Sequence, residues 1–102
     1  METKIITEFV QFETLDTTTD EQLVKAVNSL NQFQKKLDGL LDAEIVKNVK
    51  EDSWCIIFHY KDMEKVQAIG AQLRSSREFM DFGSLIVSET LNISFFQQVK
   101  NW

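Results

Sequence analysis

His59 is the only histidine in the sequence, and its imidazole can exchange a proton near neutral pH. As a general base it could take a proton from a phenol or an enol. The ordinary alternative is a half-buried strand residue whose hydrogen bonds are satisfied within the protein. We take His59 as the best candidate for a catalytic residue.

Aromatic side chains surround His59 in the sequence. Trp54, Phe58 and Tyr60 recur at every second or fourth position, so they share one face of a strand and could stack on an aromatic ligand. Further along, Met80 and its neighbours could cover a pocket, with an arginine to pair a ligand carboxylate. Core packing is the alternative for all of them. The predicted ligand pocket comprises Trp54, Phe58, Tyr60, Arg77, Phe79, Phe82 and Phe96.

Other kinds of site are not indicated. One histidine and one cysteine do not supply the ligands of a closed tetrahedral metal site, and Cys55 has no basic neighbour to activate it. The sequence contains no glycine-rich phosphate loop and no G-x-S-x-G or H-E-x-x-H motif. We therefore expect no metal and no cofactor. The acidic residues of the first part are expected to be solvated: Glu8, Glu13, Asp16, Asp20 and Glu21.

The composition is that of a globular protein, and 102 residues are expected to form one domain over 1–102. The net charge of -5 and the scattered basic residues argue against nucleic-acid binding, which requires clustered Lys and Arg. They also argue against a polybasic membrane anchor. A single cysteine favours a reducing compartment. With no basic and apolar leader expected, we predict a cytoplasmic protein.

The first half of the chain predicts a strand, a helix and a second strand. Residues 4–15 carry apolar side chains on both faces. A capping box at residues 18–21 begins a helix that runs to about Leu37, with Gly39 as its C-terminal cap. Residues 41–49 alternate and predict a strand with one wet face. Its apolar side is expected to carry Leu41, Ala43, Ile45 and Val49.

The second half repeats this order. Residues 53–60 are the most apolar strand and should be central, because an exposed edge of this composition would aggregate. Asp62 caps a second helix, which should break near Arg74. A capping box at residues 75–78 begins a short helical segment that ends at Gly83. Residues 84–89 are ambiguous, and residues 90–99 predict the last strand.

The expected order, β-α-β-β-α-β, is that of the ferredoxin-like α+β fold, with a four-stranded antiparallel sheet and the helices on one face. The sequence does not decide which strand face meets the helices. Either choice leaves large apolar side chains on the other face, and a two-fold homodimer would bury them. The alternative is a monomer in which residues 84–89 or Trp102 cover this face.

This pattern resembles the dimeric α+β barrel superfamily, and within it the antibiotic-biosynthesis monooxygenase-like domains. The resemblance extends over almost the whole chain. It rests on the polar turn 15–20, the hairpin 50–53, the apolar strand 53–60, the segment SSREF at 75–79 and the closing strand ISFFQQV at 93–99. It implies a pocket between the helices and the sheet. The superfamily also includes haem-degrading members, which use an Asn on the first strand and a His on the second helix. This chain has no Asn in residues 4–15 and no His in residues 63–82, so we argue against haem degradation.

Three functions stay open at this point. The resemblance implies a cofactor-independent oxygenase acting on a small aromatic molecule. The lack of a catalytic constellation leaves a non-catalytic small-molecule-binding or structural dimer as the alternative. A third hypothesis, a protein-interaction module with an exposed strand edge, ranks behind both. The fold by itself does not decide among them, because one fold hosts many functions.

Overall fold

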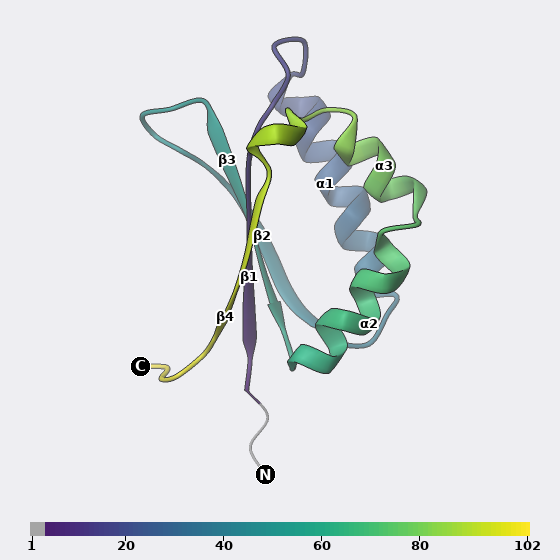
Figure 1. The fold of residues 1–102 in the computed structure, drawn as a ribbon, viewed down its shortest axis with the longest axis vertical. Coiled ribbons are helices and arrows are strands. Elements are labelled where there is room, and N and C mark those ends of the chain that lie inside the picture. The colour runs from purple at the N-terminus through teal and green to yellow at the C-terminus, as the bar shows by residue number, and fades with distance from the viewer. Residues whose placement is uncertain (1–3) are drawn as a thin grey trace.

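The computed structural model describes residues 4–102. A four-stranded sheet forms one layer and the helices form the other (Figure 1). The elements in chain order are β1 (Ile6–Glu13), α1 (Asp20–Lys35), β2 (Leu40–Lys47), β3 (Ser53–Tyr60), α2 (Met63–Leu73), α3 (Arg77–Gly83), a 3₁₀ turn η1 (Ser88–Thr90) and β4 (Asn92–Gln97).

The sheet has the strand order β2-β3-β1-β4, and all of its pairs are antiparallel. Both central strands are the apolar ones, as predicted for residues 53–60. Figure 1 shows α1, α2 and α3 on one face of the sheet and no helix on the other. The predicted ferredoxin-like α+β arrangement is therefore confirmed, with the second helical region divided into α2 and α3 near Arg74.

Two of the helix caps lie one residue later than the sequence predicted. Thr19 caps α1, and Gln22 closes the capping box by accepting from the Thr19 backbone N–H. Ser76 caps α3 and accepts from the backbone N–H of Phe79. Where two hydroxyl residues are adjacent, the sequence predicts either one as the N-cap. The path of the chain before the helix decides which of them caps it. The predicted cap Asp62 is confirmed at the start of α2.

The alternation of the strands places one side chain set under the helices. The inner face of β3 carries Trp54, Ile56, Phe58 and Tyr60, and its outer face carries Cys55, Ile57 and His59. On β2 the predicted apolar side was partly wrong. A register shift between Leu40 and Asp42 turns Leu41 outward, and Val49 lies beyond the strand end.

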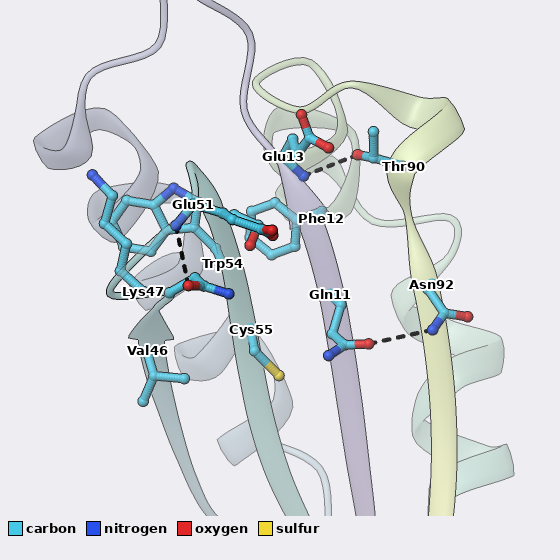
Figure 2. Close-up of a pocket in the computed structure, with 12 residues that line it drawn as sticks. Gln11, Phe12, Glu13, Val46, Lys47, Glu51, Trp54, Cys55, Thr90 and Asn92 are labelled. Atoms are coloured by element: carbon cyan, nitrogen blue, oxygen red, sulfur yellow. Dashed lines mark hydrogen bonds between the residues drawn. The ribbon is translucent and has the colours of Figure 1, made fainter.

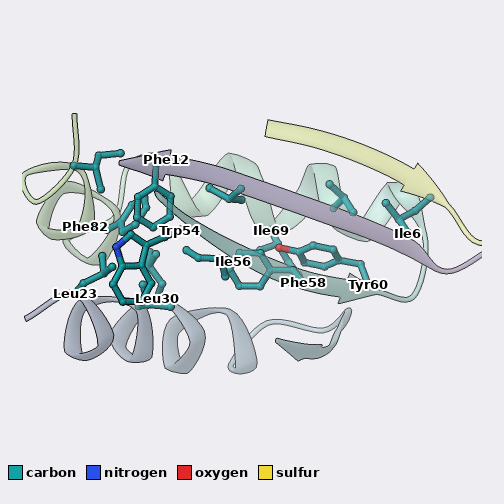
Figure 3. Packing of buried hydrophobic residues seen from close by; sticks show 14 residues of the cluster. Ile6, Phe12, Leu23, Leu30, Trp54, Ile56, Phe58, Tyr60, Ile69 and Phe82 are labelled. Carbon is teal, nitrogen blue, oxygen red and sulfur yellow. The ribbon is translucent and has the colours of Figure 1, made fainter. Parts of the chain in front are cut away.

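The core lies between the inner sheet face and the helices. Figure 3 shows Phe12, Trp54, Leu23 and Phe82 packed together at one end of this cluster. The rings of Phe12 and Phe82 meet edge to face at 5.1 Å between centroids. Burying a side chain of this size stabilises the fold by ~1.5–3 kcal/mol, so these contacts fix α1 and α3 against the strands.

The outer face of the sheet stays uncovered. Residues 84–89 do not cross it, because Ile86 is buried in the core and pairs with Thr14 beyond the end of β1. Trp102 is fully exposed. Neither of the two segments proposed as a cover in a monomer therefore lies on this face.

Gly39 does not cap α1, which ends at Lys35 with Lys36 as its C-cap. Instead it forms the entry to β2 with a φ of +134°, a conformation that favours glycine. A Cβ at Gly39 would lie 2.5 Å from Cβ of Lys65, at the root of that side chain on α2. The close approach holds the loop after α1 against the first turns of α2.

We expect Gly39→Ala to lower the free energy of unfolding by about 1–3 kcal/mol, because it adds both backbone strain and a clash that Lys65 cannot relieve. Urea denaturation monitored by circular dichroism measures this. The matched control is Gly83→Ala, where an added Cβ meets nothing within 4 Å. A Gly39→Ala protein as stable as the wild type would contradict the account.

Candidate functional site

A groove opens on the helix side of the sheet, between α2, α3 and the edge strand β4. Its volume is about 500 Å³, within the range of small-molecule sites. Most of its lining is apolar, and the rim residues Met63, Ile93 and Phe95 are partly exposed. The groove is lined by Glu8, Tyr60, Met63, Val66, Gln67, Ile69, Gly70, Leu73, Arg74, Phe79, Ile93 and Phe95.

Glu8 is the carboxylate of this groove. It stands on the inner face of β1 between Ile6 and Val10, and its side chain is half-buried. Burial raises the pKa of the Glu8 carboxyl above its ordinary value, and a hydrogen bond from Tyr60 opposes this only in part. A carboxylate with a raised pKa in an apolar groove is suited to accept a proton.

Tyr60 links Glu8 to Gln34. The Tyr60 hydroxyl lies 3.1 Å from Oε1 of Glu8 and 2.7 Å from Oε1 of Gln34, which is completely buried on α1. Figure 3 shows this hydroxyl pointing back into the core. Burial, followed by the nearby charge of Glu8, raises the pKa of Tyr60, so the phenol stays protonated.

The Tyr60 hydroxyl has one hydrogen and two acceptors, which makes the network responsive to the state of Glu8. When Glu8 is ionised, the hydrogen can point to the carboxylate. When Glu8 is protonated, it can donate to Tyr60, and Tyr60 can donate to Gln34. The network therefore offers a hydrogen bond to Glu8 before and after it accepts a proton.

A smaller chamber of about 50 Å³ forms the inner end of the groove. The two spaces share the lining residues Glu8, Leu73, Phe79 and Ile93. Apart from Glu8, Gln34 is the only polar residue among the described residues that line this chamber. Its Nε2 is buried and has no hydrogen-bond partner among residues 4–102.

A second hollow, of about 440 Å³, lies at the other end of the sheet beside the β2–β3 hairpin (Figure 2). Several of its polar groups are engaged with one another: Gln11 accepts from Asn92, and the Glu13 backbone N–H donates to Thr90. Its two carboxylate residues, Glu13 and Glu51, are exposed. Because these two carboxylates are exposed, whereas Glu8 is half-buried in a mostly apolar groove, we favour the groove as the candidate site.

The structure divides the residues predicted to line a pocket. Tyr60 and Phe79 lie in the groove, and Phe58 and Phe82 lie in its inner chamber. Trp54 is buried at the far end of the core, beside the hollow. The groove thus gathers four of the seven residues.

The remaining predicted residues lie elsewhere. Phe96 is on the open sheet face, where its ring meets Phe9 edge to face at 5.4 Å. Arg77 is exposed and lines neither the groove nor its chamber; the arginine that lines the groove is Arg74, the C-cap of α2. His59 lies on the open face, where its Nδ1 pairs with the exposed carboxylate of Asp42. The catalytic role of His59 stays a prediction.

Glu8 was expected to be a solvated charge, and this was wrong. The signal was present in the sequence, because Glu8 occupies an inner position of an alternating strand. Gln34 carried a similar signal, since it follows Leu23, Val27 and Leu30 at helical spacing on the buried stripe of α1. In this chain, polar residues at positions expected to be apolar would have indicated the candidate groove.

Two other features are absent from the described residues. No group of three or more His, Cys, Asp and Glu side chains in residues 4–102 is placed to hold a metal ion. Within the same range, no helix has the length and apolar character needed to cross a membrane. Cys55 is a free, half-buried thiol, and burial raises its pKa.

Comparison with known proteins identifies the fold. No family profile and no curated protein sequence matches the chain. Among solved structures, SnoaB from Streptomyces nogalater, a cofactor-independent oxygenase, is 12% identical, with 96% of each chain covered and a TM-score of 0.74. A Caulobacter crescentus protein, provisionally named an antibiotic biosynthesis monooxygenase, is 13% identical, with coverage of 96% of this chain and 92% of that one and a TM-score of 0.75.

A protein of the same provisional name from Nitrosomonas europaea is 10% identical. The match covers 97% of this chain and 94% of the Nitrosomonas europaea chain, with a TM-score of 0.74. At these identities the likeness concerns the fold. The resemblance to antibiotic-biosynthesis monooxygenase-like α+β domains expected from the sequence is confirmed at that level, over nearly the whole chain.

The raised pKa of Glu8 predicts a pH-dependent stability. The folded protein binds this proton more tightly than the unfolded chain, so Glu8 should lower the free energy of unfolding as pH rises from its ordinary pKa of 4.5 through the raised value. Glu8→Gln cannot ionise and should escape this loss. Urea denaturation of both proteins from about pH 4 to about pH 8 isolates the effect, because the other carboxylates titrate in both.

The stability difference between the two proteins should grow as pH rises, by about 1.4 kcal/mol for each tenfold difference in proton affinity between folded and unfolded Glu8. A difference that stays constant across this range would show that burial does not raise the pKa of Glu8.

Proposed function

We propose that this chain binds a small aromatic molecule in the groove between α2, α3 and β4, and that Glu8 accepts a proton from its hydroxyl or enol. Such a proton transfer would begin a cofactor-independent oxygenation. The observation that carries the proposal is a single half-buried carboxylate with a raised pKa in a mostly apolar groove. The fold shared with the oxygenase SnoaB supports the same reaction class.

In the proposed step the substrate O–H bond breaks and its proton moves to the Glu8 carboxylate. The electron pair stays on the substrate, which becomes an electron-rich anion. Dioxygen is the oxidant that this anion would then meet. Phe79 and the other apolar walls would exclude water and favour an aromatic ligand, while Tyr60 would keep a hydrogen bond to Glu8 throughout.

The alternative is a chain that binds a small molecule without converting it. The same groove favours this function, since an apolar cavity with one polar end binds ligands whether or not chemistry follows. The two functions differ in one measurable property, the consumption of dioxygen in the presence of a bound aromatic hydroxyl compound.

We also propose that two copies of this chain form a homodimer through their open sheet faces. This face carries Phe9, Ile57 and Phe96 across three neighbouring strands, with Phe96 57% exposed. Polar side chains, among them the His59–Asp42 pair, lie beside this apolar centre. A two-fold axis through this centre would pack the apolar patch of one chain against the same patch of the other. Both patches would then be buried without any further partner.

The function is tested with 1-naphthol and 1,4-dihydroxynaphthalene as probes, by fluorescence titration and with an oxygen electrode. We expect the wild type to bind both and to accelerate dioxygen uptake with at least one. Glu8→Gln keeps the shape of the groove but cannot accept the proton. It should bind the probes and lose about 100-fold or more of the uptake rate.

Two control variants give each outcome a meaning. Glu13→Gln is the same change on the outer face of the same strand and should leave binding and uptake unchanged. Binding lost in Glu13→Gln and kept in Glu8→Gln would place the ligand in the hollow instead. Uptake lost only in His59→Ala would restore the prediction for His59, and binding without uptake by the wild type would favour the non-catalytic alternative.

The dimer is tested by size-exclusion chromatography with light scattering. The wild type should elute with twice the mass of one chain. Phe96→Glu places a charge at the centre of the open face and should give a folded monomer. Met80→Glu, a matched change at a residue 68% exposed on the outside of α3, should leave the dimer intact. A monomeric wild type would refute this proposal.

A further inference from the structure

Gln34 is the most completely buried polar side chain of the described residues beside the groove, with an exposed fraction of 0%. Its Oε1 accepts a hydrogen bond from Tyr60, but its Nε2 carries two hydrogens and has no partner within residues 4–102. Leaving a buried donor unpaired is unfavourable for folding, because the donor loses its hydrogen bonds to water and gains none in the protein. An apolar residue would fill this position of α1 without that penalty.

The surroundings of Gln34 indicate where a partner could be. Gln34 lines the inner chamber, whose other walls are apolar except for Glu8. The residues next to Gln34 on the buried stripe of α1, Leu30 and Val27, have no polar side-chain atom that could accept a hydrogen bond from Nε2. The chamber and the groove share four lining residues, so a ligand in the groove would lie next to the chamber that Gln34 lines.

We infer that the unpaired Nε2 of Gln34 donates a hydrogen bond to a carbonyl oxygen of the ligand, so the preferred ligands are aromatic hydroxy-carbonyl compounds. This inference rests on the proposed function and specifies its substrate class. Gln34 and Glu8 both lie within hydrogen-bonding distance of the same Tyr60 oxygen. The ligand we infer would carry its hydroxyl and its carbonyl a few atoms apart on one ring, the hydroxyl toward Glu8 and the carbonyl toward Gln34.

This arrangement assigns Gln34 a part in the proton transfer. When the ligand hydroxyl gives its proton to Glu8, the electron pair of the broken bond remains on the ligand. Conjugation spreads the negative charge to the neighbouring carbonyl oxygen. A fixed N–H donor at that oxygen would stabilise the anion more than the neutral ligand, as donors do in an oxyanion hole. The protonated Glu8 would at the same time donate to Tyr60, which donates to Gln34.

The groups that face Glu8 and Gln34 come from three further elements. β3 supplies Tyr60, and α2 supplies Gln67; Arg74, the C-cap of α2, also lines the groove. β4 supplies Phe95, which pairs with Glu8 across the strands. Arg74 lines the groove but not the inner chamber, so it can attract an anionic ligand without replacing the Gln34 donor.

The test compares two probes that differ by one carbonyl group, 1-naphthol and 2-acetyl-1-naphthol, by fluorescence titration of the full chain. The wild type should bind the acetyl probe about tenfold more tightly, the effect of one added hydrogen bond to a buried donor. Gln34→Met keeps the size of the side chain and removes its amide group. The ratio of its affinities for the two probes should fall to about one, and it should be no less stable to urea than the wild type.

A measurement without any substitution complements the variant. In wild-type protein with ¹⁵N-labelled glutamine, one side-chain amide signal should move on addition of 2-acetyl-1-naphthol and not on addition of 1-naphthol. This result does not depend on the folding of Gln34→Met.

The outcomes separate this inference from the proposed function. If the wild type binds both probes equally and no amide signal moves selectively, Nε2 is satisfied by water and the role of Gln34 is refuted, while the proposed groove stands. A preference that survives in Gln34→Met refutes it as well. If the wild type binds neither probe, the proposed function fails, and this inference fails with it.

Discussion

The pairing of β1 with β3 at the centre of the sheet is the constraint on which the other features depend. Their register sets Val10 opposite Ile56 and Phe12 opposite Trp54, and so places one apolar set from both strands on the same face. A shift by one residue would turn every one of these side chains outward. The helices follow from this choice, because only this face offers the continuous apolar surface that the stripes of α1 and α2 require. The same register places Glu8 opposite Phe58 and diagonal to Tyr60.

The site is a local exception to the logic of the core. Glu8 and Gln34 occupy positions that the alternation of β1 and the periodicity of α1 reserve for apolar residues. Each is unfavourable for folding, since one is a carboxylate in apolar surroundings and the other has a donor without a partner among residues 4–102. The remaining core is apolar and closely packed, and it tolerates two such residues. A polar residue at an inward position lowers stability and can serve binding or catalysis. Here Glu8 and Gln34 both contact the hydroxyl of Tyr60.

The two faces of the sheet serve different purposes. The inner face builds the groove, and its polar groups Glu8, Tyr60 and Gln34 belong to one connected set. The outer face carries an apolar centre beside polar residues, including His59 with Asp42. This division accounts for the separation of the aromatic residues that the sequence predicted as one pocket. Phe96 is near Tyr60 in the sheet but projects to the opposite side. It pairs with Thr7, which in turn pairs with the outward-facing His59, and paired residues project to the same face.

The order of the elements, the central position of residues 53–60, the cap at Asp62 and the helix break near Arg74 follow from the amino-acid sequence. They depend on local periodicity and on side chains that bond their own backbone. Which face of the strands meets the helices is settled in the folded chain alone. That choice depends on contacts between segments far apart in the chain, such as β1 with α1 and β3. It turned His59 outward, turned Leu41 away from the core at a register shift, and left Glu8 half-buried on the inner face. The site was therefore visible in the sequence as misplaced polar residues, but their meeting at Tyr60 required the fold.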